Sequence, residues 1–226
     1  MGTLSVVATP IGNLGDITLR ALETLKSADA IACEDTRVTS KLLARYDIQK
    51  PLVIYHARSG LLAATRVLSL LAEGKHVALV TDAGTPGVSD PGSELVALVR
   101  ERFAATVRIE AIPGPSALAA ALSIAGLPVA TFVFLGFLPH KKGRQTLFTD
   151  IAEETRAVVF YESPHRIEKA LASLAKVLGP TRTVSVFREL TKIHEEVVTG
   201  TASEVVAHFT AHPETIRGEF VVIVAP

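Results

Sequence analysis

The sequence predicts a protein of two α/β domains, with a parallel sheet in the first domain and a mixed sheet in the second. Short β-rich segments alternate with longer amphipathic segments along most of the chain. Three helix- and strand-breaking residues interrupt this alternation near the middle, within "IPGPS" at 112–116. A chain of 226 residues is also long enough for two α/β units of about 110 residues each. We therefore expect domains at 1–113 and 114–226.

Five apolar segments in the first half are expected to be strands, at 4–8, 30–33, 52–55, 77–81 and 107–112. Each is apolar on both faces, and a helical pattern separates it from the next, which is typical of a parallel sheet covered on both sides. The expected helices span 16–28, 39–46, 61–74 and 92–103. Asp16 is the residue type that caps a helix N-terminus, so we expect it to begin the first helix.

The second half repeats the alternation, with strands expected at 131–137, 157–162, 183–189, 194–200 and 218–225. Helices are expected around 144–154, 165–178 and 203–212. Only "LTKI" joins the third and fourth of these strands, which is too short for a parallel crossover. These two strands should therefore form an antiparallel hairpin, which makes the second sheet mixed.

Composition excludes several classes of protein. Lys plus Arg and Asp plus Glu both number 23, so the chain lacks the overall basic excess of a generic nucleic-acid binder. The single cysteine, Cys33, cannot form an internal disulfide, which favours a reducing intracellular setting, and we expect it to be buried. No apolar run approaches the ~20 residues of a membrane helix. We therefore expect a cytoplasmic protein with no membrane partner.

Four loops that follow predicted strands of the first sheet are candidates for a ligand site, at 9–16, 33–37, 81–92 and 113–117. In parallel sheets these loops meet at one edge, where ligands bind. The first loop lacks G-x-G-x-x-G, and neither glycine-rich loop has the G-x-x-x-x-G-K-[ST] of a phosphate loop. Backbone-rich loops without these patterns favour a small, flexible ligand that carries no phosphate.

Two aspartates in the third of these loops have different expected roles. Asp82 follows the strand directly and should face the ligand site. Asp90 precedes Pro91 and should shape the turn that starts the next helix.

The second half carries ionisable residues at the ends of predicted strands, in "YESPHR" at 161–166 and "RELTKIHEE" at 188–196. Surface charge is the ordinary explanation for such residues. A function is favoured for "YESPHR", because the charges follow an apolar strand directly and Pro164 fixes the start of the next helix. His165 and His194 could help to hold a metal, but no H-x-x-x-H spacing supports this, so we expect none.

The motifs together resemble a known family. They are "VATPIGNLGDIT", "CEDTR", "LVTDAGTPGVSDPG", "PGPSALAAALSIAGLP", "FLGFLP", "YESPHRI", "RELTKIHEE" and "GEFVVIV". In this order and spacing they resemble the tetrapyrrole-methylase superfamily of S-adenosylmethionine enzymes, and within it the branch that modifies ribosomal RNA. The resemblance extends from residue 4 to residue 225.

The resemblance implies an activity and a set of donor-binding residues. The implied reaction is 2′-O-methylation of a cytidine ribose in the decoding region of 16S rRNA, within the small ribosomal subunit. It also implies a homodimer and two α/β domains that hold S-adenosylmethionine in the cleft between them. The donor-site positions carried over are Pro10, Ala83, Gly84, Thr85, Val88, Ser116, Ala117 and Glu162, with Asp82 beside them.

Methylation of a hydroxyl needs positioning, a proton acceptor and stabilisation of the developing oxyanion. Glu34 or Asp35 is the candidate proton acceptor or orienting group, and Lys192 is a candidate neutral amine or charge stabiliser. RNA also requires cations for its phosphates. The candidate substrate-binding residues are Arg37, Lys141, Lys142, Arg144, His165, Arg166 and Arg188.

Three alternatives remain open from the sequence. A small-molecule methylase of the precorrin type would share the donor loops, although "CEDTR", "YESPHR" and "PHKKGR" favour the RNA-modifying branch. A donor-binding module without catalysis is disfavoured by the ionisable residues in both halves. An NTP-hydrolysing protein is the least favoured, because the chain has no phosphate loop.

Overall fold

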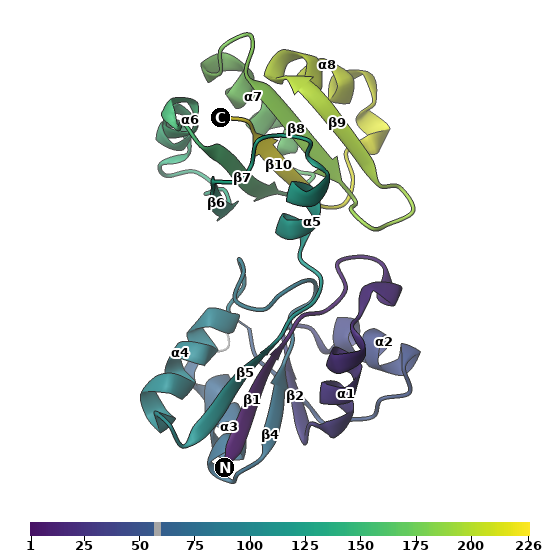
Figure 1. Cartoon of the computed structure of the whole chain (residues 1–226), viewed down its shortest axis with the longest axis vertical. Coiled ribbons are helices and arrows are strands. Elements are labelled where there is room, and N and C mark those ends of the chain that lie inside the picture. The colour runs from purple at the N-terminus through teal and green to yellow at the C-terminus, as the bar shows by residue number, and fades with distance from the viewer. Residues whose placement is uncertain (57–59) are drawn as a thin grey trace. The chain divides into compact units, whose positions relative to one another are not determined.

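The computed structural model describes the backbone of residues 1–56 and 60–226, and the side chains other than those of 57–63. The chain divides into two compact units, Met1–Ser116 and Ala117–Pro226. Both are α/β units, as the sequence predicts (Figure 1). The division falls three residues after the expected boundary, so that 114–116 belong to the first unit.

The first unit contains a five-stranded sheet in the order β3-β2-β4-β1-β5. Every pair of neighbouring strands is parallel. The strands are β1 (Gly2–Val7), β2 (Ala30–Cys33), β3 (Leu52–Ile54), β4 (His76–Leu79) and β5 (Val107–Ile112). The helices are the short η1 (Leu14–Asp16), α1 (Leu19–Ser27), α2 (Thr36–Arg45), α3 (Gly60–Ala72) and α4 (Gly92–Phe103).

Two apolar clusters cover the two faces of this sheet. Leu25 of α1 and Leu43 of α2 pack with Ile31 and the buried Cys33 on one face. Leu71 of α3 and Leu95 of α4 belong to the cluster on the other face. Figure 1 shows α1 and α2 on one side of the sheet and α3 and α4 on the other. Because β2 leads toward one face and its neighbour β4 toward the other, their carboxyl ends border the crevice where ligands collect in such sheets.

The expected N-cap of the first helix is wrong. Asp16 lies in the short helix η1, which Asn13 caps by accepting from the Gly15 amide. The long helix α1 starts three residues later, where the Thr18 backbone is extended and its hydroxyl oxygen accepts from the Ala21 amide. The second helix, by contrast, begins earlier than expected, at Thr36, because the Asp35 side chain accepts from the Arg37 amide and caps it.

The second unit contains a mixed sheet in the order β6-β7-β10-β8-β9. Only the β6–β7 pair is parallel. Its strands are β6 (Phe132–Phe137), β7 (Ala157–Glu162), β8 (Thr183–Arg188), β9 (Glu196–Thr201) and β10 (Phe220–Val224). The helices are α5 (Ala117–Ile124), α6 (Arg144–Glu153), α7 (Ile167–Val177), α8 (Ala202–Ala211) and the short η2 (Pro213–Thr215). The predicted β8–β9 hairpin is confirmed.

The central strand β10 brings two ionisable segments to one edge of this sheet. Phe220, its first residue, pairs with Glu162 at the end of β7 and with Arg188 at the end of β8. "YESPHR" and "RELTKIHEE" therefore emerge at the same edge of the sheet, on either side of β10, although 26 positions separate Glu162 from Arg188. Phe148, Phe160 and Phe209 fill the core behind this edge. No helix among the described residues has the length and apolarity to span a bilayer.

Candidate functional site

Four polar residues meet at the crevice between the carboxyl ends of β2 and β4. The Thr81 hydroxyl donates to Glu34 Oε1 at 2.7 Å. The Asp35 amide donates to Asp82 Oδ1 at 3.2 Å. The structure thus brings Asp82 to Glu34 and Asp35, from which it is 48 and 47 positions away in the sequence.

The pKa values of the two candidate proton acceptors are shifted in opposite directions. Burial raises the pKa of Glu34, and the charges of Asp82 and Asp90 add to this, while the Thr81 hydrogen bond opposes it. Hydrogen bonds from the Arg37 side chain and backbone lower the pKa of Asp35 to about 2. A carboxylate with a raised pKa is the stronger base, so this geometry favours Glu34 over Asp35 as the proton acceptor.

Backbone hydrogen bonds tie the loops after β1 and β4 together. The amide of Thr9 donates to the carbonyl of Gly84 at 2.9 Å, and the Gly84 amide donates back to the Thr9 carbonyl at 3.1 Å. The Thr9 hydroxyl adds a hydrogen bond to the Thr81 carbonyl at 3.0 Å. The Thr85 hydroxyl extends the connection to the loop after β5, by donating to the Pro115 carbonyl at 3.1 Å.

The loop 81–92 is partly exposed, with Asp82, Ala83 and Gly87 at the surface and Gly84 buried. Gly84 has φ +84°, a conformation that side-chain-bearing residues rarely adopt. The amides of Ala83 and Thr85 donate no hydrogen bond to any described residue, and Ala83 is exposed. Asp90 Oδ1 accepts from the Gly87 and Gly92 amides, both at 2.7 Å, which confirms its expected role in the turn before α4.

The other expected donor-site residues have different degrees of exposure. Pro10 is buried, whereas Val88, Ser116 and Ala117 are partly exposed. Ser116 ends the first unit and Ala117 begins the second.

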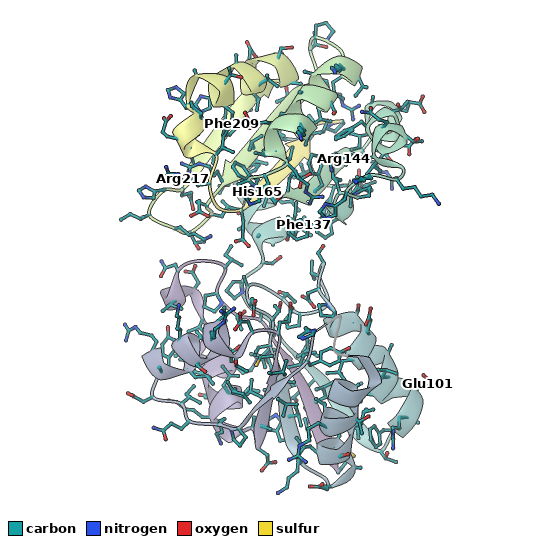
Figure 2. The ribbon with its side chains drawn as sticks, turned by 180° about the vertical axis from the view of Figure 1, so that it is seen from behind. Glu101, Phe137, Arg144, His165, Phe209 and Arg217 are labelled. Carbon is teal, nitrogen blue, oxygen red and sulfur yellow. The ribbon has the colours of Figure 1, made fainter. Side chains whose placement is uncertain are left out.

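In the second unit, Glu162 forms a buried ion triad with two arginines. Its side chain is fully buried, and its two oxygens pair with Arg144 Nη2 at 2.9 Å and with Arg166 Nη2 at 2.7 Å. The amide of Ser163 also donates to Glu162 Oε1, at 2.9 Å. The expected donor-binding residue therefore already has polar partners for both of its oxygens. Figure 2 shows Phe137 and His165 near the same edge of this unit.

Lys192 lies in the loop between β8 and β9. Its Nζ pairs with Glu189 Oε1 at 2.7 Å and with Glu219 Oε2 at 3.4 Å. Burial lowers the pKa of Lys192, but the Glu189 hydrogen bond and the two negative charges outweigh burial and raise it overall. The surroundings thus favour the charged ammonium, and with it the charge-stabilising role rather than the neutral amine.

The remaining candidate cations fall into two groups. Arg37, Lys141, Lys142 and His165 are exposed. Arg188 is buried, and its Nε donates to Glu196 Oε2 at 2.9 Å, so this arginine holds the hairpin as well as lying near the edge.

Two residues near the candidate groups were not named from the sequence, Thr81, the partner of Glu34, and Gly218. Glu189, the partner of Lys192, was recognised only as one of the ionisable residues of its segment, without a role. A Cβ on Gly218 would lie 1.7 Å from Glu189 Oε1, so only glycine leaves that carboxylate its place. Glu189 stands within "RELTKIHEE", where a spacing of three residues from Lys192 was the available signal.

Comparison with known proteins identifies the class. Residues 3–206 match the family model of the tetrapyrrole (corrin/porphyrin) methylases. The chain therefore belongs to this family, which confirms the resemblance seen in the sequence.

Among the described residues, no group of three or more His, Cys, Asp or Glu side chains is arranged to hold a metal.

Individual relatives give a more specific similarity than the family model does. The chain is 47% identical over 226 residues to ribosomal RNA small subunit methyltransferase I of Synechocystis sp., covering all of this chain and 79% of that one. It is 45% identical over 209 residues to the protein of the same name from Thermotoga maritima, covering 92% of each. A relative from Halalkalibacterium halodurans, also of this name, is 48% identical over 225 residues, with 99% and 75% covered.

Solved structures confirm the fold. The structure of the methyltransferase CobJ matches with a TM-score of 0.74 and 24% identity, and covers all of this chain and 94% of that one. Uroporphyrin-III-C-methyltransferase from Thermus thermophilus matches with a TM-score of 0.70 and 20% identity over the same shares. At these identities the likeness concerns the fold alone.

Proposed function

We propose that this protein is an S-adenosylmethionine-dependent methyltransferase of ribosomal RNA. Its proposed substrate is the 2′-hydroxyl of a cytidine in the decoding region of 16S rRNA, within the small ribosomal subunit. The observation that carries the proposal is the 45–48% identity, over at least 92% of the chain, to relatives named ribosomal RNA small subunit methyltransferase I. The arrangement of Glu34 in the crevice of the first sheet supports a proton-transfer role in that reaction.

The loops of the first unit fit a donor with an amino-acid group and a nucleoside group. Amides such as those of Ala83 and Thr85 suit carboxylate and hydroxyl groups of a ligand, and the carbonyls of the same loops suit its amines. A Cβ on Gly84 would make only an ordinary contact with Ile11, at 3.5 Å, so the positive φ of +84° and not crowding is what favours glycine here. We assign donor binding to Pro10, Asp82, Ala83, Gly84, Thr85 and Val88, with Ser116 and Ala117.

Glu34 is the proposed proton acceptor. When bound, S-adenosylmethionine supplies an electrophilic methyl group, and its transfer to a hydroxyl forms an O–C bond, leaves the S–C electron pair on sulfur and releases the hydroxyl proton. The Thr81 hydroxyl orients the Glu34 carboxylate through Oε1, so that Oε2 is left to take that proton. Asp35 orients the same segment, by capping α2 and by donating its amide to Asp82.

The charged groups of the second unit are proposed to act on the acceptor RNA. Lys192, held as an ammonium by Glu189, stabilises the oxyanion that develops on the ribose. Lys141 and Lys142, in the exposed loop before α6, contact phosphates. We assign Arg144, His165, Arg166 and Arg188 of this unit to RNA binding, and Arg37 of the first unit to a separate phosphate contact.

We also propose that the protein is a homodimer. The segment that forms α5 and the edge strand β6 is apolar but poorly covered: Ile124, Phe132 and Phe137 are 51%, 38% and 50% exposed. An apolar edge strand of this kind is normally covered by a partner, and a second copy of the chain is the partner we propose. Light scattering of Phe132→Glu should then give the monomer mass, whereas a dimeric variant would count against this surface. A cytoplasmic location stays a prediction.

Transfer of a labelled methyl group tests the activity. Labelled S-adenosylmethionine is incubated with small ribosomal subunits that lack the modification, and separately with a precorrin substrate. The proposal predicts label in 16S rRNA at the 2′-oxygen of a cytidine, and its loss with Glu34→Gln. Label in the precorrin alone would support the small-molecule alternative, and donor binding without any transfer would support a non-catalytic module.

A further inference from the structure

We propose that Glu162 is a positioning residue for RNA, which fixes the basic loop 138–144 through Arg144 and Arg166 rather than contacting the methyl donor. This inference rests on the proposed RNA-methylating function. It replaces the donor-binding role that the resemblance assigned to Glu162.

The first step is that both ends of the loop are attached to the arginines that Glu162 holds. Arg166 Nη1 donates to the Leu138 carbonyl at 2.8 Å, at the start of the loop. Arg144, at its end, donates through Nη1 to the Pro139 carbonyl at 3.0 Å. Glu162 pairs with the Nη2 atoms of both arginines, so one carboxylate fixes both ends of the loop.

The second step is the burial of the triad. The Glu162 side chain is fully buried, and those of Arg144 and Arg166 are only 14% and 17% exposed. Ion pairs out of water hold their geometry, and removing one partner leaves an uncompensated charge. Between the two attached ends, residues 139–143 are all exposed.

The third step concerns the positive charges in the exposed part of the loop. Lys141 and Lys142 stand in its exposed part, without an ion pair to any described residue. A loop fixed at both ends presents these ammonium groups in one place, so less conformational entropy is lost when a phosphate binds. A mobile loop would carry the same charge but bind more weakly.

The consequence is that Glu162→Gln should weaken RNA binding while leaving donor binding intact. We expect the Kd and KM for small ribosomal subunits to rise about tenfold, with the Kd for S-adenosylmethionine and kcat within about twofold of wild type. We also expect trypsin to cleave after Lys141 and Lys142 severalfold faster, which is a readout independent of activity. The matched control is Glu154→Gln, which breaks a more exposed Arg156 pair in the same unit and should leave every measurement unchanged.

A second pair of variants separates this inference from the proposed function. Lys141→Ala/Lys142→Ala should weaken RNA binding and reduce its salt dependence. In that background Glu162→Gln should have little further effect on RNA affinity, because both changes act through one loop.

The outcomes are distinct. Weaker binding of S-adenosylmethionine by a folded Glu162→Gln, with unchanged trypsin cleavage, would overturn the inference and restore the donor-binding role. Unchanged RNA binding in the double lysine variant would instead count against the RNA-binding assignment of the loop. If Glu162→Gln does not fold, Arg144→Met keeps the Glu162–Arg166 pair and should still accelerate cleavage at the two lysines. Unchanged cleavage would refute the proposal that the arginines fix the loop.

Discussion

Replacing Thr81 by valine should shift the pH dependence of methyl transfer without removing the proposed base. Thr81 is 7% exposed and donates to the Glu34 carboxylate at 2.7 Å. A hydrogen bond to a charged group contributes about 1.5–3 kcal/mol, and one pKa unit corresponds to about 1.4 kcal/mol. Since Glu34 is partly exposed and water replaces part of the lost bond, we expect its pKa to rise by about one unit.

The direction of this pH shift follows from the charge state that the proton acceptor needs for the reaction. The hydroxyl stabilises the ionised carboxylate, so its loss favours the protonated form, which cannot accept a proton. The acidic limb of log(kcat/KM) against pH should therefore move upward by about one pH unit, with the plateau at high pH retained. Single-turnover methyl transfer to small ribosomal subunits, measured across the pH range, gives this profile.

Thr24→Val is the matched control for this substitution. Thr24 is equally buried, at 8% exposed, but its hydroxyl donates to the Arg20 carbonyl within α1. The acidic limb of the pH profile of Thr24→Val should coincide with that of wild type. A folded Thr81→Val whose acidic limb also coincides would refute the assignment of Glu34 as the base.

Four further outcomes are expected. Glu34→Gln should lower kcat by about 10²–10⁴-fold, and Asp35→Asn should lower it less, because the pKa of Asp35 is already about 2. Because the pKa of Glu34 is raised, the folded state binds this proton more tightly than the unfolded state, so folding stability falls as pH rises through the folded-state pKa. Glu34→Gln, which does not ionise, should therefore be at least as stable as wild type in thermal melting at pH 8. Gly218→Ala should displace Glu189 and lower kcat about tenfold, whereas Gly126→Ala, which also has a positive φ but open space around it, should keep the wild-type rate. Arg182→Met should lower the free energy of unfolding in urea by about 3 kcal/mol, since its guanidinium donates to the carbonyls of Ile151, Ala152, Glu154 and Ala225; equal losses for Arg182→Met and the exposed Arg156→Met would contradict this.

The strand pattern was predictable because buried strands consist of apolar, β-branched residues with turn-forming residues between them. All ten expected strands are present, and the short "LTKI" connection correctly indicated the β8–β9 hairpin. The start of α1 was not predictable in this way, since Asp16 and Thr18 are both good caps and only the backbone decides between them. Which residue caps depends on how the preceding loop turns.

The segments that form the candidate site could be predicted from the sequence, but the residues that their side chains contact could not. "CEDTR" and "RELTKIHEE" could be recognised as chemical segments, and Arg37 stands two positions from Asp35, the carboxylate it contacts. Thr81, the partner of Glu34, is 47 positions away, and no sequence pattern indicates that contact. The partners of Glu162 likewise depend on how α6 packs beside β7, which a sequence pattern does not record.

The position of β10 at the centre of the second sheet has a consequence for the order of folding. Strands β7 and β8 have no contact in the sheet until residues 220–224 enter between them. During synthesis, β6 with β7 and β8 with β9 can each pair early, but their shared edge must await a segment made much later. The Glu162 triad and the Glu189–Lys192 pair would then reach the edge of one sheet only in the final step, so that a nascent chain holding its first unit complete would still lack the assembled charged edge of the second.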